Sequence, residues 1–184
     1  MNVRSAWLDT KNIALLGFMT AGKSRVGQAL ALRTGLPLRD VDLLIEAIER
    51  IPIHRIFQEK GEPYFRALES RVLADLCAGS GQIVSLGGGT VLLAENRALL
   101  RARCVAVWLG VSVEQVLTRL ADPESPRRPL LEGHDPAVLV PQLLGQREAF
   151  YAEALGDDGI RVETDGRGID DLAAEIALRL GLVG

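Results

Sequence analysis

The feature that most constrains this chain is a short segment near its beginning, residues 17–24, with the sequence GFMTAGKS. The segment fits the pattern Gly-x-x-x-x-Gly-Lys-Ser/Thr, directly follows the apolar run 13–16 and precedes a stretch of helical spacing. A strand, a glycine-containing turn and a helix in this order form a phosphate-binding loop, whose backbone N–H groups and helix N-terminus face phosphate oxygens. We expect Lys23 to neutralise the β- and γ-phosphates and the Ser24 hydroxyl to bind Mg²⁺. A nucleoside triphosphate is therefore the first expected ligand, and an accidental glycine turn is the alternative.

The rest of the chain alternates between short apolar runs and stretches of helical periodicity. Five strands joined by helices favour a parallel sheet with helices on both faces, so we expect a three-layer α/β/α fold of the P-loop NTPase type. Residues 1–184 are expected to form a single domain. The irregular, proline-rich segment 121–133 is expected to be a functional lid. The expected strands are 12–17, 38–41, 82–86, 104–109 and 160–164, and the expected helices are 23–34, 43–50, 53–59, 63–77, 94–102, 112–120, 135–155 and 170–180.

The composition is that of an ordinary globular protein and argues against several classes of function. With 24 acidic and 21 basic residues, the net charge of −3 gives no overall attraction to nucleic acid or to an anionic membrane. No apolar run is long enough to span a bilayer, and the first residues lack the apolar core of a signal peptide, so we expect a cytoplasmic protein. Cys77 and Cys104 are interpreted as buried thiols in a reducing compartment, and not as a disulfide or a metal pair. His54 and His134 have no partners at metal-ligand spacing and are interpreted as structural residues.

Polar residues and glycines follow the second and third expected strands. In a parallel sheet the carboxyl ends of the strands carry the chemistry, so these residues are candidates for a site. If the second strand runs through Val41, Asp40 and Asp42 both face the cleft. One of them could then hold Mg²⁺ through water while the other accepts a proton from an attacking hydroxyl; a helix cap is the alternative role for Asp42. The segment Gly87-Gly88-Gly89 carries no side chains, which suits a ligand that packs on the backbone, and a flexible loop is the alternative.

Three arginines are candidates for binding an anion. Arg66 lies one helical turn before Glu69, whose carboxylate can orient the guanidinium. Arg147 lies in an expected helix four residues before Tyr151, and Arg128 lies in the expected lid. Taken singly, each of these arginines is more often a solvated surface residue.

Taken together, these segments resemble one family, the shikimate kinases. The phosphate loop, Asp40-x-Asp42, Phe65-Arg66-x-x-Glu69, Gly87-Gly88-Gly89, Arg128-Pro129-Leu130-Leu131 and Arg147-x-x-x-Tyr151 occur in the order and approximate spacing of that family, over residues 12–180. The resemblance implies a fold like that of nucleoside monophosphate kinases, with strand order 2-3-1-4-5. It also implies a monomer that transfers the γ-phosphoryl group of ATP to the 3-hydroxyl of shikimate, with one Mg²⁺ ion bound with ATP.

On the acceptor side, the resemblance implies roles for several residues. Asp42 would hold the 3-hydroxyl and deprotonate it. Arg66 and Arg147 would clamp the shikimate carboxylate, because a guanidinium fork suits a planar anion. Gly88 would contact the ring through its backbone, and Gly87 and Gly89 would shape the turn.

On the nucleotide side, Lys23 and Arg128 would be catalytic together with Asp42. Arg128 would stabilise charge on the transferring phosphoryl group. Ser24 would bind Mg²⁺ directly and Asp40 would support the ion through water. Arg167, after the last strand, would pack against adenine, and a surface arginine is the alternative. The expected ATP-binding residues are Gly17, Thr20, Ala21, Gly22, Lys23, Ser24, Arg25, Arg128 and Arg167.

Two departures from the family pattern bear on the nucleotide site. Thr20 stands where the family usually has glycine, so the backbone there must tolerate a β-branched side chain, and we expect altered nucleotide affinity without loss of function. The segment between Arg119 and Arg128 is slightly longer than usual, so no nucleotide contact is assigned to Arg119.

Two alternative functions remain open from the sequence. One is phosphorylation of another acceptor, such as gluconate or a nucleoside monophosphate; such an enzyme shares the loop but does not need Arg66, Gly88 and Arg147. The other is a ligand-sensing module derived from the kinase, against which the retained Lys23 and Asp42 argue. We therefore expect ATP and shikimate as the binding partners, with no nucleic acid and no membrane.

Overall fold

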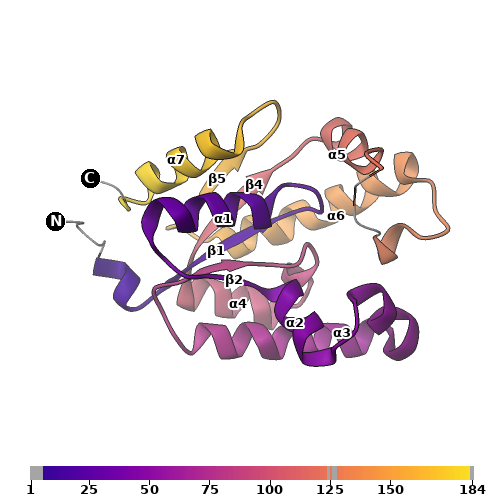
Figure 1. The fold of residues 1–184 in the computed structure, drawn as a ribbon, viewed down its shortest axis with the longest axis horizontal. Coiled ribbons are helices and arrows are strands. Elements are labelled where there is room, and N and C mark those ends of the chain that lie inside the picture. Colours follow the sequence, from indigo (N-terminus) through magenta and orange to yellow (C-terminus); the bar gives the residue numbers. More distant parts are fainter. Residues whose placement is uncertain (1–5, 124, 126–127, 183–184) are drawn as a thin grey trace.

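At the centre of the structure is a five-stranded parallel sheet with the strand order β2-β3-β1-β4-β5 (Figure 1). The computed structural model describes residues 6–123, 125 and 128–182. The strand order confirms the one that the family resemblance implied. The strands are β1 (Asn12–Gly17), β2 (Leu38–Asp40), β3 (Ile83–Ser85), β4 (Cys104–Gly110) and β5 (Ile160–Glu163).

Helices cover both faces of the sheet, as expected. On one face α1 and α7 lie side by side, and α3, α4 and α6 cover the other (Figure 1). The helices are α1 (Lys23–Thr34), α2 (Val41–Glu49), α3 (Ile53–Cys77), α4 (Ala94–Arg103), α5 (Val113–Leu120), α6 (Pro136–Leu155) and α7 (Ile169–Arg179). Three short 3₁₀ turns are η1 (Ala6–Asp9), η2 (Thr90–Leu92) and η3 (Pro129–Leu131).

The central strand β1 is buried along its whole length. Side chains alternate across a strand, so Ile13 and Leu15 join the core beneath α1 and α7, while Ala14 and Leu16 join the core on the opposite face. Burial on both faces explains why this strand is a continuous apolar run in the sequence. The phosphate loop that follows β1 is thereby held at the middle of the sheet's carboxyl edge.

Several element boundaries differ from those expected. The second strand ends at Asp40 and not at Val41, because the Asp40 carboxylate caps α2 by accepting hydrogen bonds from the backbone N–H groups of Asp42 (3.1 Å) and Leu43 (3.3 Å). The alternative role considered for Asp42, a cap of this helix, is therefore taken by Asp40. The expected helices 53–59 and 63–77 form the single element α3, interrupted at Gly61, where φ is 81°.

The expected lid, 121–133, contains the 3₁₀ turn η3 and is followed by α6, whose first turn is capped by the Asp135 carboxylate. Residues 124, 126 and 127 of this segment lie outside the described residues, so its function as a lid stays a prediction. Across residues 6–123, 125 and 128–182, no helix is long and apolar enough to cross a membrane.

Candidate active site

A pocket of about 580 Å³ lies at the carboxyl edge of the sheet, where the phosphate loop, α2, α3, the glycine segment after β3, η3 and α6 meet. Ser24, Asp40 and Asp42 line it beside the loop, and Arg66 and Arg147 line it from α3 and α6. Gly87, Gly88, Gly89 and Arg128 complete the set of expected residues in its wall. The structure thus brings together residues that are widely separated in the sequence.

The phosphate loop has the backbone conformation that its glycines predict. Gly17 has φ 146°, and a Cβ atom there would lie 2.5 Å from the carbonyl oxygen of Leu109 in β4, so only glycine fits. Lys23 donates hydrogen bonds to the carbonyl oxygens of Gly17 and Phe18, both at 2.9 Å. Loss of hydration lowers the pKa of Lys23 to about 8, and the nearby Asp42 carboxylate opposes that shift. An anion that entered the loop would supply the charge that stabilises this ammonium group.

Thr20 adopts a left-handed backbone conformation, with φ 61°. This conformation is unusual for a β-branched residue and explains why glycine is common at the position. Arg119 helps to hold it: its guanidinium donates to the carbonyl oxygen of Thr20 at 2.7 Å and to that of Thr164 at 3.4 Å. Sequence reasoning left Arg119 without a role, because the contact joins segments that are 99 residues apart.

The two carboxylates after β2 have different surroundings. One oxygen of Asp40 caps α2, and the other accepts a hydrogen bond from the Ser24 hydroxyl at 2.6 Å. Asp42 lines the pocket, and burial, followed by the repulsion of Asp40, raises its pKa to about 6, although Lys23 and Arg128 oppose the shift. A carboxylate with such a pKa is ionised at neutral pH and can accept a proton from a hydroxyl group.

Arg66 is held firmly by acidic neighbours. Its guanidinium donates to Glu69 at 2.8 Å and to Glu62 at 3.0 Å. Glu69 is fully buried and also accepts a hydrogen bond from the Thr90 hydroxyl at 2.6 Å, so it connects α3 to η2. The expectation that Glu69 orients Arg66 is confirmed by this geometry.

Arg147 is 4% exposed and has a different environment. It donates to the carbonyl oxygen of Gly88 at 3.4 Å and lies over the ring of Phe18, 5.4 Å from its centroid. Tyr151, one helical turn along α6, donates to the same carbonyl oxygen at 2.6 Å. Tyr151 therefore fixes the glycine segment, a function that the sequence signalled only by its spacing from Arg147.

The pocket contains cationic groups that the protein itself does not neutralise. Within residues 6–123, 125 and 128–182, neither Arg128 nor Arg147 forms an ion pair with a carboxylate, and the Nε atom of Arg128 is buried without a hydrogen-bond partner. Burial lowers the pKa of Arg128, and Asp42 opposes that shift. A pocket of this kind favours ligands that carry several negative charges.

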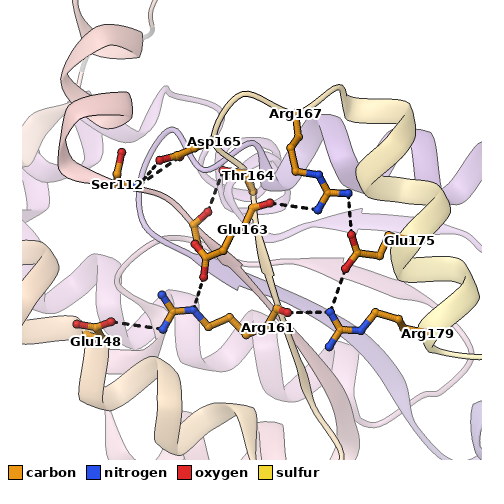
Figure 2. Close-up of polar contacts among 10 residues, drawn as sticks. Ser112, Glu148, Arg161, Glu163, Thr164, Asp165, Arg167, Glu175 and Arg179 are labelled. Atoms are coloured by element: carbon orange, nitrogen blue, oxygen red, sulfur yellow. Dashed lines mark hydrogen bonds and ion pairs between the residues drawn. The ribbon is translucent and has the colours of Figure 1, made fainter.

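Of the nine expected ATP-binding residues, Ser24 and Arg128 line this pocket, whereas Gly17, Thr20, Ala21, Gly22, Lys23, Arg25 and Arg167 do not. Arg25 is exposed on α1. Arg167 forms an ion pair with Glu175 at 2.7 Å and donates to the carbonyl oxygen of Glu163 at 3.4 Å, so its guanidinium is held between β5 and α7 (Figure 2). Nearby, in a separate contact, the Asp165 carboxylate accepts a hydrogen bond from the backbone N–H of Ser112, the N-cap residue of α5 (Figure 2).

Several pocket residues were not identified from the sequence. Ile53, His54 and Phe57 line the acceptor side from the first turns of α3, and Leu130 lines it from η3. His54, interpreted as a structural residue, therefore lies in the pocket wall. Helical spacing of Ile53 and Phe57 is the same signal that a core position gives, so it could not distinguish a pocket from a core.

Comparisons with known proteins place these features in a family. A family model described as shikimate kinase matches residues 19–180. The chain is 41% identical to a shikimate kinase of Geobacter metallireducens, over 94% of this chain and 93% of that protein. It is 42% identical to a shikimate kinase of Pseudomonas syringae, over 92% of this chain and 96% of that protein.

Solved structures agree with these relatives. The structure of shikimate kinase from Acinetobacter baumannii in complex with shikimate is similar with a TM-score of 0.86 and 35% identity, and the match covers 95% of this chain and 96% of that chain. A gluconokinase from Sinorhizobium meliloti is similar with a TM-score of 0.55 and 19% identity, covering 94% of this chain and 92% of that chain. At that identity the gluconokinase shows a shared fold alone.

Proposed function

This chain belongs to the shikimate kinase family, whose members transfer a phosphoryl group from ATP to shikimate, and from that premise we propose how its residues act. The reaction is transfer of the γ-phosphoryl group of ATP to the 3-hydroxyl of shikimate, which gives shikimate 3-phosphate and ADP. The observation that carries the proposal is the juxtaposition, in one pocket, of Asp42 beside the phosphate loop and of Arg147 without a carboxylate partner among the described residues.

Asp42 holds the 3-hydroxyl of shikimate and accepts its proton as the oxygen attacks the γ-phosphorus. Its pKa of about 6 supports this role, because the group is ionised at neutral pH yet is a better proton acceptor than an ordinary carboxylate.

Arg66 and Arg147 bind the shikimate carboxylate, and the glycine segment 87–89 lies against the ring. Arg66 is prearranged by Glu69 and Glu62, so little side-chain entropy is lost when it binds a ligand. Arg147 gains an anionic partner only when substrate is present, and Gly88 is held in place by Tyr151. The site therefore combines Arg66, whose charge is neutralised by carboxylates of the protein, with Arg147, whose charge is available to neutralise the substrate.

The phosphate loop binds ATP through residues 17–24, with Lys23 on the β- and γ-phosphates. Arg128 stabilises the charge of the transferring phosphoryl group, which its buried Nε atom supports, since a buried donor without a partner is costly in the free protein. Arg25 and Arg167 remain proposed nucleotide contacts. The guanidinium of Arg167 would pack against adenine while its ion pair with Glu175 holds it in place.

Ser24 and Asp40 fit a magnesium ion, because a hydroxyl and a carboxylate oxygen that lie 2.6 Å apart offer the hard oxygen donors that Mg²⁺ prefers. Ser24 would bind the ion directly and Asp40 through water. When bound, the ion would neutralise charge on the β- and γ-phosphates.

We also propose that the chain acts as a monomer in the cytoplasm and that residues 1–184 form a single domain with a lid at 121–133. The two free thiols suit a reducing compartment.

A coupled assay of ADP release with shikimate, gluconate and AMP as separate acceptors tests the function. Of the three acceptors, we expect ADP release only with shikimate. A greater release of ADP with gluconate or AMP would contradict the proposed substrate. Arg147→Ala should raise the KM for shikimate more than it lowers kcat, because this contact is present in both the ground state and the transition state. Arg71→Ala, at an exposed position of α3, is the control and should leave both constants unchanged.

A further inference from the structure

The only two cysteines of the chain meet at the edge of the sheet opposite the active site. Cys77 is the last residue of α3, and Cys104 is the first residue of β4 (Figure 1). They are 27 positions apart, yet their Sγ atoms lie 3.8 Å apart, and both side chains are buried. Because β4 begins at Cys104 and the pocket lies at the carboxyl ends of the strands, this pair is separate from the catalytic machinery.

The backbone on both sides of the pair is held in place. Arg103 donates a hydrogen bond to the carbonyl oxygen of Cys77 at 2.9 Å, which ties the end of α3 to the start of β4. Asn12 pairs with Cys104 in the sheet, and its side chain donates to the carbonyl oxygens of Leu76 (3.4 Å) and Gly79 (3.0 Å). The proximity of the two sulfurs is therefore a property of the folded backbone and not of one side-chain orientation.

A disulfide has an S–S distance of about 2.05 Å, so the two sulfurs need to approach by less than about 2 Å. Small rotations about χ1 at both cysteines can supply this movement while the tethered backbone stays in place. Cys104 also lines a cleft of about 530 Å³ on the surface, together with Arg101, Glu153 and Gly156. A small oxidant can therefore approach the buried pair from this cleft, because one of its two residues lies in the cleft wall.

We propose that Cys77 and Cys104 form an oxidation site, in which a peroxide converts the two thiols into a reversible disulfide that fastens α3 to β4. The hydrogen bond from Cys104 and the charge of Arg103 lower the pKa of the Cys77 thiol, whereas the same hydrogen bond and burial raise the pKa of the Cys104 thiol, so Cys77 is the sulfur with thiolate character. The expected reduced thiols are the resting form, and the disulfide is the product of oxidation.

The chemistry balances with one peroxide for each disulfide. One sulfur, as thiolate, attacks a peroxide oxygen; the O–O bond breaks, a sulfenic acid forms and hydroxide leaves as water. The second sulfur then attacks the sulfenic sulfur, the S–O bond breaks, the S–S bond forms and a second water leaves. Two thiols are oxidised and one peroxide is reduced to two waters, whichever sulfur reacts first.

The test is to treat the folded, full-length protein with hydrogen peroxide and to alkylate it afterwards under denaturing conditions. We expect the wild-type protein to lose both alkylation sites, to decrease in mass by about 2 Da, as expected for loss of two hydrogens in disulfide formation, and to yield a proteolytic fragment that links Cys77 to Cys104. A reducing agent should restore both thiols. Because the disulfide lowers the conformational entropy of the unfolded state, the melting temperature of the oxidised protein should also be higher, by roughly 3–10 °C.

The variants Cys77→Ala and Cys104→Ala, treated in parallel, should each keep one thiol and show no loss of mass. Three outcomes would overturn the proposal: wild-type protein that keeps both thiols, a mass gain from oxygen addition in place of the loss, or covalent dimers in place of the internal link. A melting temperature that is lower after oxidation would show that the native backbone does not accommodate the bond, and would also overturn it.

Discussion

The buried ion pair between Glu69 and Arg66 offers the sharpest test of how the acceptor site is organised. Glu69 is fully buried and accepts two hydrogen bonds, one from Arg66 at 2.8 Å and one from the Thr90 hydroxyl at 2.6 Å. Glu69→Gln keeps the shape of the side chain but removes its charge and one acceptor oxygen. The Thr90 hydroxyl can adapt, because the carbonyl oxygen of Gly87 lies 3.0 Å away and can accept its proton, while its oxygen accepts from the new amide.

The loss is then confined to Arg66, whose ion pair with Glu69 becomes a hydrogen bond from the charged guanidinium to a neutral amide oxygen. Hydrogen bonds to charged groups contribute about 1.5–3 kcal/mol, so we expect a destabilisation of roughly 2 kcal/mol. For a chain of this size this corresponds to a fall in melting temperature of roughly 4–8 °C. Arg66 would also be less firmly oriented, and the KM for shikimate should rise by roughly 3- to 10-fold, since tenfold corresponds to about 1.4 kcal/mol.

Thermal unfolding followed by circular dichroism and steady-state kinetics with shikimate measure both effects. Glu62→Gln is the matched control: Glu62 pairs with the same arginine, but its side chain is 44% exposed, so its loss should cost less than about 1 kcal/mol. If Glu69→Gln melted like the wild-type protein and kept its KM, the argument that Glu69 orients the carboxylate clamp would be refuted. Equal effects of the two variants would likewise refute it.

Three further predictions concern the phosphate loop and the base. Lys23→Ala should abolish detectable ADP release while the circular dichroism spectrum stays unchanged, because this side chain stabilises charge and does not fill the core; turnover by the folded variant would remove Lys23 from the mechanism. The pKa of Asp42 is raised to about 6, so the protonated form of this carboxyl group accumulates below that pH. Because only the ionised form can accept a proton, kcat/KM for shikimate should fall as the pH decreases through about 6. In Asp42→Asn, kcat should be lower by roughly two orders of magnitude, and kcat/KM should no longer fall at low pH. If the variant kept this fall, the titration would belong to another group. Thr20→Gly should melt roughly 2–4 °C above Thr20→Ala, because alanine keeps the left-handed strain at φ 61° and glycine relieves it; equal melting temperatures would show that the loop relaxes instead.

The sequence predicted most reliably the features that depend on neighbouring residues. The phosphate loop is such a feature, because strand, turn and helix are adjacent in the chain and Gly17 meets a steric requirement that one residue type satisfies. The sequence also predicted the five strands, of which β1, β3 and β4 are buried throughout, whereas β2 and β5 are partly exposed. It did not separate a strand residue from a helix cap at Asp40, because an N-cap residue has the same extended backbone as a strand residue.

Contacts between distant segments could not be predicted in this way. Arg119 reaches the carbonyl oxygen of Thr20, and Tyr151 reaches that of Gly88, 63 residues away. A carbonyl oxygen has no sequence signal, since every residue carries one. The packing of the helices that carry these side chains, α5 for Arg119 and α6 for Tyr151, determines which carbonyl oxygen each side chain meets. The helical spacing of Arg147 and Tyr151 was visible in the sequence, but the partner that they share was not.

The charge of the pocket depends in the same way on tertiary structure. Arg66, Arg128 and Arg147 are the same residue type, and in the sequence each could be a surface arginine. In the fold, Arg66 is neutralised by Glu69, whereas Arg147 is 4% exposed, donates to a carbonyl oxygen and lies over the Phe18 ring, without a carboxylate partner among the described residues. A buried guanidinium without an anion is costly, and the helix that carries it is retained because the rest of α6 packs well. An anionic substrate that enters the pocket removes that cost, so part of its binding free energy comes from a charge that the folded protein leaves uncompensated.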